Sequence, residues 1–178
     1  MTGDDPYIHR GDADEYTDMG AVLSNDENYR YQLWREWDPK KGTVGFVMVN
    51  PSTADGMEDD ATITRIVNYA KRWGYGRVVV ANLFALRSSD PSDLGEHEDP
   101  VGPKNDEYLQ ETCQEAEKVV AAWGTNGTRQ NRHREVVETL DFELYALDTT
   151  KHGHPVHPLF EKKDLEPSPF DYDDDDEE

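Results

Sequence analysis

Two kinds of side chain in this 178-residue sequence could do chemistry together, namely amides and imidazoles. Asn50 and Asn82 come at the ends of apolar runs, and His154 and His157 lie close together, each followed by a proline. An amide presents a donor and an acceptor side by side, whereas an imidazole can give or take a proton near neutral pH. Prolines stiffen the loop that carries the histidines. The pattern predicts a site that orients a polar ligand and stabilises charge.

Four apolar runs would bring these residues to one place. They span 44–49, 77–83, 119–123 and 143–147, and segments with helical spacing at 60–73, 105–118 and 131–140 alternate with them. This alternation predicts an α/β fold, a three-layer sandwich with a mostly parallel central sheet of about four strands. Residues 29–37 alternate large apolar with polar side chains, which indicates an antiparallel edge strand beside the first buried one.

Open parallel sheets bind ligands outside the carboxyl ends of their strands, and all four apolar runs end in polar or small residues. We therefore take Asn50, His154 and His157 as candidate catalytic residues. The candidate substrate-binding residues are Pro51, Ser52, Thr53, Asp55, Asn82, Arg87, Trp123, Gly124 and Asn126. Each motif alone is also typical of a turn or a helix start. The connection 84–104 is long enough to be a functional lid.

Other chemistries find less support in the sequence. His152, His154 and His157 would bind a metal only if a carboxylate such as Asp55 or Asp148 converged on them, so we expect no metal and no cofactor. Glycine-rich phosphate loops and the nucleophile elbow of hydrolases are absent from the sequence. Cys113 is the one cysteine and falls in a helical segment without an adjacent histidine, which indicates a core position.

Charge is unevenly distributed along the chain, whose formal net charge is −21. Residues 1–27 hold eight acids and one base, and residues 171–178 hold seven acids and no base. We expect both segments to be disordered tails that flank one α/β domain at 28–170. The acidity is typical of salt-rich cytoplasm and argues against a basic nucleic-acid surface, although less so at high salt. With no apolar run of about 18 residues and no signal peptide, we expect no membrane partner and a cytoplasmic location.

Five segments, taken in order, resemble the domain-of-unknown-function family 1643. They are 47–55, 72–91, 99–106, 119–127 and 153–159. A more distant resemblance links the chain to uracil-DNA glycosylases, whose first site motif ends an apolar strand as Val49-Asn50-Pro51 does. Trp123-Gly124 is similar to a later strand end in those enzymes, and both His154-Pro155 and His157-Pro158 match their last motif.

This resemblance implies a glycosylase-like fold acting on a nucleobase, nucleotide or nucleic acid. Asn50 would position a water molecule, Asn82 would pair with the base, and His154 or His157 would stabilise charge on the departing base. Since an asparagine is no general base, hydrolysis would depend on orientation and electrostatics. Two alternatives stay open: a non-catalytic module that binds a nucleotide or similar polar ligand, and an interaction protein that uses its acidic tails. The oligomeric state is not predicted by the sequence.

Overall fold

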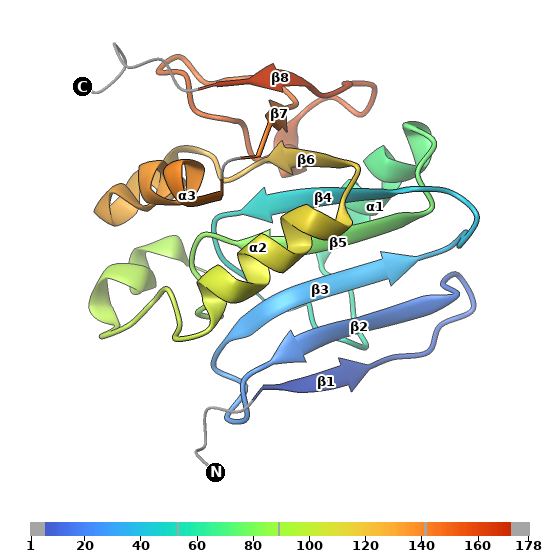
Figure 1. The fold of residues 1–178 in the computed structure, drawn as a ribbon, viewed down its shortest axis with the longest axis horizontal. Helices are drawn as coiled ribbons and strands as arrows, with labels where there is room; N and C mark the ends of the chain where they lie inside the picture. The colour runs from blue at the N-terminus through green and yellow to red at the C-terminus, as the bar shows by residue number, and fades with distance from the viewer. Residues whose placement is uncertain (1–5, 53, 89, 141, 172–178) are drawn as a thin grey trace.

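The computed structural model describes residues 6–52, 54–88, 90–140 and 142–171. These form one mixed sheet of eight strands in the order β1-β2-β3-β5-β4-β6-β7-β8 (Figure 1). The strands are β1 (Tyr7–Arg10), β2 (Asp18–Leu23), β3 (Arg30–Glu36), β4 (Thr43–Met48), β5 (Arg77–Asn82), β6 (Lys118–Ala121), β7 (Leu144–Ala146) and β8 (Ser168–Phe170).

The four predicted buried strands form a parallel block at the centre of the sheet. β4 pairs in parallel with both β5 and β6, and β6 pairs in parallel with β7. The sheet as a whole is nevertheless mixed rather than mostly parallel, because β1, β2, β3 and β8 all pair antiparallel with their neighbours. The expected α/β class is confirmed, and the expected strand count is too low.

Three α-helices cover the two faces of this sheet: α1 (Ala61–Arg72), α2 (Asn105–Glu115) and α3 (Arg132–Leu140). Ile63, Ile66 and Val67 of α1 pack in one core with alternate residues of β4 and β5. Leu109 of α2 and Val136 of α3 pack in a second core on the other residues of the same strands. Figure 1 accordingly shows α2 and α3 on one side of the sheet and α1 on the other.

α1 begins and ends where its sequence predicts. The side chain of Asp60 accepts a hydrogen bond from the Ile63 backbone N–H at 2.9 Å and so caps the first turn. Gly74, with φ of +89°, takes the left-handed conformation just after the last turn. The amino end of α1 lies beside the carboxyl ends of the central strands, because α1 follows β4, and ligands bind at this place in such folds.

The N-terminal region differs from the expectation of a disordered tail over residues 1–27. Residues 7–10 and 18–23 form β1 and β2, and Met19, Ala21 and Leu23 are buried. The prediction was wrong because the acid count over the whole segment hid the short apolar run at 19–23. The expected C-terminal tail lies outside the described residues, apart from Asp171.

The strand predicted at 29–37 is antiparallel, as expected, but it is not an edge. β3 lies between β2 and β5, so it also does not neighbour β4, the first buried strand of the sequence. The hairpin of β1 and β2 covers one edge of β3, and β5 covers the other. Its first residue, Arg30, lies at the same sheet end as the carboxyl terminus of the parallel strands, since β3 runs in the opposite direction to β5.

The long connection 84–104 contains a 3-10 helix, η1 (Pro91–Glu96), and packs tightly in its described part. Leu94 is fully buried, and the backbone N–H groups of Ala85 and Leu86 donate to the carbonyls of Val101 and Pro100. These contacts fix the connection against the sheet end. A role as a moving lid stays a prediction.

Candidate active site

A cavity of about 630 Å³ opens at the carboxyl ends of β4, β5 and β6, beside the amino end of α1. Eight of the residues singled out from the sequence line it: Asn50, Pro51, Ser52, Asn82, Trp123, Gly124, Asn126 and His157. Asp55, Arg87 and His154 do not line it, and Thr53 lies outside the described residues. The parallel register explains the convergence, because Met48 is paired with Asn82 and Val47 with Ala121.

Asn82 is the most unusual group in this cavity. Its side chain is fully buried, yet neither Nδ2 nor Oδ1 has a hydrogen-bond partner among the residues that the structure describes. Leaving a buried amide unpaired costs about 1–3 kcal/mol for each unmet group, and few such groups survive in native proteins. A donor and an acceptor are therefore held ready beside the cavity.

A second layer of polar groups fixes the backbone that carries Asn82. The side-chain amide of Asn105, also fully buried, donates to the carbonyls of Asn82 and Leu83 at 2.8 and 3.0 Å. The Nε–H of Arg132 donates to the same Leu83 carbonyl at 2.8 Å. The end of β5 is thus held from behind, and the conformation of Asn82 does not depend on its own side chain.

Asn50 has a different set of contacts from Asn82. Its Nδ2 donates to the backbone carbonyls of Pro51, Leu86 and Ser88 at 3.0, 3.3 and 2.8 Å. Both amide hydrogens are thereby used to join the loop after β4 to the loop after β5. What Asn50 can offer a ligand or a water molecule is its carbonyl oxygen, which is a hydrogen-bond acceptor.

The two histidine candidates have different surroundings. His157 lines the cavity, and its Nδ1 accepts from the Leu159 backbone N–H at 3.2 Å at the start of the 3-10 helix η3 (Pro158–Phe160). Burial lowers the pKa of His157, against an opposing effect of the Asp60 charge, so the ring is neutral at pH 7. With Nδ1 accepting, the ring proton lies on Nε2. His154 instead packs edge to face against His133 of α3, with ring centroids 5.8 Å apart.

Trp123 and Gly124 shape the wall next to His157. The Trp123 ring is only 1% exposed and packs in the second core, edge to face with Phe170. Gly124 has φ of +65°, and its N–H donates to the Pro155 carbonyl at 2.8 Å, which joins the β6 end to the histidine loop. This backbone contact brings His157 to the cavity.

Two charged residues line the cavity but were not predicted as site residues from the sequence: Arg30 and Asp60. One carboxylate oxygen of Asp60 caps α1, and the other accepts from the Ser52 hydroxyl at 2.8 Å. Burial raises the pKa of Asp60, but the hydrogen bonds from Ile63 and Ser52 and the charge of Arg30 outweigh it, so the net shift is downward. Asp60 is therefore ionised. The sequence did not indicate a site role for Arg30, because Arg30 alternates with apolar residues as a surface side chain of a strand would.

The remaining candidates hold loops rather than the cavity. Asp55 Oδ1 accepts from the backbone N–H groups of Met57 and Glu58 and closes the turn before α1. The Arg87 guanidinium donates to the Glu27 carbonyl at 3.3 Å. Their polar side chains at strand ends serve turns, which is the structural role that such residues also fill in other proteins.

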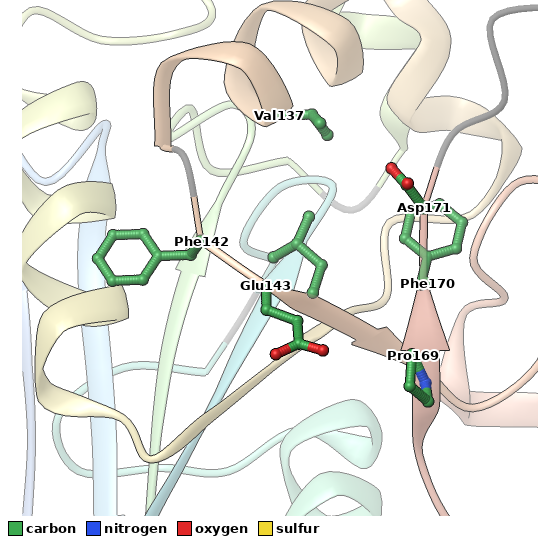
Figure 2. Close-up of a pocket in the computed structure, with 7 residues that line it drawn as sticks. Val137, Phe142, Glu143, Pro169, Phe170 and Asp171 are labelled. Atoms are coloured by element: carbon green, nitrogen blue, oxygen red, sulfur yellow. The ribbon is translucent and has the colours of Figure 1, made fainter.

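A second cavity of about 450 Å³ lies between α3, β7 and β8 (Figure 2). Its lining includes Val137, Phe142 and Phe170 together with the carboxylates of Glu143 and Asp171. It opens beside Leu144, the first residue of β7, at the opposite end of the parallel strands from Asn82. Because only carboxylates accompany its apolar lining, this space offers less chemistry than the first cavity.

Metal ligands and membrane spans were sought among the described residues. No group of three or more His, Cys, Asp and Glu side chains there is arranged to hold a metal ion. In the same part of the chain, no helix has the length and apolar character needed to cross a membrane. Cys113 is buried, and burial raises the pKa of its thiol to about 12, so it is an unreactive core residue.

The fold and site define an α/β protein with a polar ligand cavity at the carboxyl ends of parallel strands. Comparison with family models places the chain more narrowly: residues 30–159 match the family described as protein of unknown function (DUF1643), to which the chain belongs. This confirms the resemblance to domain-of-unknown-function family 1643. Neither a curated protein nor a solved structure matches the chain.

Proposed function

We propose that the cavity binds a nucleobase and that the protein hydrolyses the N-glycosidic bond of the bound nucleoside, nucleotide or nucleic acid. The observation that carries this proposal is the buried, unpaired amide of Asn82 at the cavity. A planar base edge with adjacent donor and acceptor atoms, as in uracil, is the complement of such an amide. The distant likeness to uracil-DNA glycosylases supports the same assignment and a shared fold ancestry.

Bond cleavage would draw on three further side chains. As the C–N bond breaks, its electron pair leaves with the base, and the Nε2–H of His157 donates to the base oxygen that becomes negative. The ionised Asp60 stabilises the positive charge that develops on the sugar carbon. The carbonyl oxygen of Asn50 accepts a hydrogen bond from a water molecule, whose oxygen bonds to that carbon and whose proton passes to solvent.

A second candidate function is a module that binds a nucleotide or similar polar ligand without turnover. Two observations favour it. The Trp123 ring packs away in the core instead of offering a face for base stacking. Both hydrogens of the Asn50 amide are used on backbone carbonyls, as in a residue that holds loops. Such a module would bind the same ligands with the same dependence on Asn82.

We also propose a setting for this activity, the salt-rich cytoplasm of a cell. With a net charge of −21, the protein would repel the phosphates of a polynucleotide at low ionic strength. At high salt the Debye length falls below about 10 Å, so the repulsion between the protein and the phosphates is screened. Interaction through the acidic tails stays a further possibility for partners, and it would not involve the cavity.

Release of free base tests the catalytic proposal. The substrates are single- and double-stranded DNA containing uracil, and uridine as a small substrate, each at high and low salt. We expect base release by the natural protein and a loss of at least about 100-fold in Asn82→Ala and His157→Gln. His154→Gln is the matched control and should retain turnover within a few-fold, because its ring packs against His133 outside the cavity.

Base release that survives both cavity variants would refute this site. If folded protein releases no base but binds uridine in an Asn82-dependent way, the binding module is the correct assignment.

A further inference from the structure

Arg30 carries a buried positive charge beside the cavity that the proposed reaction does not use. Its side chain is 3% exposed and lines the cavity, and its Nη1 donates to the Ala54 carbonyl at 2.9 Å. Its Nε–H has no partner among the described residues. A buried guanidinium whose Nε–H has no acceptor is costly, so a ligand group that accepts from this N–H would bind strongly.

The charge of Arg30 is not neutralised by a direct ion pair. No carboxylate of the described residues comes within 4.0 Å of it, whereas the buried Arg35 and Arg132 both form ion pairs. Among the neighbouring charges, Asp60 has the largest effect on the pKa of Arg30, yet the Asp60 oxygens already accept from Ile63 and Ser52. Burial lowers the pKa of Arg30 to about 9, which leaves it protonated at neutral pH.

The amino end of α1 adds to this positive potential. Ala61, Thr62 and Ile63, the first residues of the 12-residue helix, line the same cavity as Arg30. The aligned peptide dipoles of a helix make its amino end electropositive, and phosphate groups bind there. The Asp60 cap offsets part of this potential, so the guanidinium is the main attraction for an anion.

Arg30 and Asn82 also lie close enough to serve one ligand. The backbone N–H of Arg30 donates to the carbonyl of Ala85, three residues beyond Asn82, at 2.9 Å. Both side chains line one cavity of about 630 Å³, within the range of about 300–1,000 Å³ that small-molecule sites span. A ligand with a base at one end and an anion at the other fits this pair of groups.

We propose that Arg30 forms an anion subsite that binds a phosphate of the ligand, so that a nucleoside phosphate is preferred over a free nucleoside. This inference deepens the function proposed above and depends on it for the base. The phosphate belongs either to a mononucleotide or to the backbone of a polynucleotide. The guanidinium chemistry is the same for both, since Arg binds phosphate oxygens through paired N–H donors.

Calorimetric titration of the full chain separates these cases. The probes are uridine, uridine 5′-monophosphate, inorganic phosphate and a short uracil-containing single strand, with Arg30→Met and Asn82→Ala as variants. Arg10→Met is the control, because it removes one positive charge from an exposed ion pair on β1. Circular dichroism and the melting temperature show which variants are folded. Arg30→Lys, which keeps the charge, replaces Arg30→Met if the latter does not fold.

We expect the monophosphate to bind at least about tenfold more tightly than uridine, because a hydrogen-bonded charge pair contributes about one power of ten or more. Arg30→Met should remove this preference with little effect on uridine binding, and Arg30→Lys should reduce it, because lysine keeps the charge but lacks the paired N–H donors. Asn82→Ala should weaken the binding of both ligands equally. Tighter binding of the strand than of the monophosphate, with the same Arg30 dependence, would assign the phosphate to a polynucleotide.

Equal binding of uridine and its monophosphate by the natural protein would overturn the anion subsite while leaving the base site intact. Arg30-dependent binding of inorganic phosphate without any uridine binding would support the subsite and contradict the proposed function. If folded protein binds none of the probes, both proposals fail.

Discussion

At the scale of single residues, two buried asparagines meet at the end of β5 and differ in their hydrogen bonding. Asn82 is the last residue of β5, and Asn105 is the first residue of α2. Asn105 uses its amide hydrogens on two backbone carbonyls, and only its Oδ1 has no partner among the described residues, whereas neither Nδ2 nor Oδ1 of Asn82 has one. An unpaired buried amide destabilises a protein, and a paired one stabilises it. Under the proposed function, the amide of Asn82 serves a ligand, while the amide hydrogens of Asn105 serve the fold.

Replacement by leucine, which has a similar volume, tests this contrast. We expect Asn82→Leu to raise the free energy of unfolding by about 1–2 kcal/mol, since it removes an unpaired polar group, and to abolish ligand binding. Asn105→Leu should lower it by about 1–3 kcal/mol, because the carbonyls of Asn82 and Leu83 each lose a donor, although Arg132 still donates to Leu83. Chemical denaturation monitored by tryptophan fluorescence measures both. Equal destabilisation by the two changes would show that Asn82 has a structural partner.

The residue scale also shows how far the sequence determined the site. Asn50, Asn82 and His157 were found because they follow apolar runs, and the parallel register then brings strand ends together. The choice between His154 and His157 could not be made, because it depends on the packing of His133 and the path of one loop. Arg30 was missed because burial of a charged residue depends on the partners that cover its strand.

At the scale of elements, one buried side chain joins the N-terminal hairpin to the helix layer. Arg35 on β3 is fully buried and forms an ion pair with Asp59 at 2.7 Å. It also donates to the Gly20 carbonyl on β2 at 3.2 Å and to the carbonyls of Asp55 and Glu58 before α1. The turn that leads into α1, and with it the capping Asp60 of the cavity, is therefore positioned by β3.

Arg35→Met should therefore destabilise the protein by about 3–5 kcal/mol, because it leaves the half-buried Asp59 and several carbonyls without their donor. The melting temperature from calorimetry measures the loss. Arg77→Met on β5, which breaks a more exposed ion pair with Glu115, is the matched control and should cost less than about 1 kcal/mol. If both variants lower the melting temperature by the same amount, the buried contacts of Arg35 contribute no more to stability than the more exposed ion pair of Arg77.

Helices and central strands were predictable because each has a clear hydrophobic pattern, and α1 has in addition the cap residues Asp60 and Gly74. The neighbours of β3 were not predictable. Strand order follows from how hairpins and crossovers pack in three dimensions, and the alternation in 29–37 is the same in an edge strand and in an interior one covered by a hairpin.

At the scale of the whole molecule, charge dominates the response to solution conditions. The chain carries 39 acids and 18 bases, and self-repulsion at low ionic strength opposes the compact state. Salt shortens the range of this repulsion from about 30 Å at 0.01 M to about 3 Å at 1 M.

We expect the melting temperature to rise by about 10 °C or more between 0.05 and 2 M KCl, since many repulsive pairs are screened together. Scanning calorimetry at a series of KCl concentrations measures this. Potassium sulfate at matched ionic strength is the comparison, because sulfate also strengthens burial of apolar surface. A melting temperature that does not change with KCl would contradict a salt-adapted protein.

The boundaries of the family match have a consequence for the edges of the sheet. The match covers residues 30–159, which contain β3 to β7, whereas β1, β2 and β8 lie outside it. A chain cut to the matched range would leave the backbone donors and acceptors of β3 and β7 open to another strand, which is a template for aggregation. The matched segment thus leaves out the strands that cover both outer edges of β3 and β7.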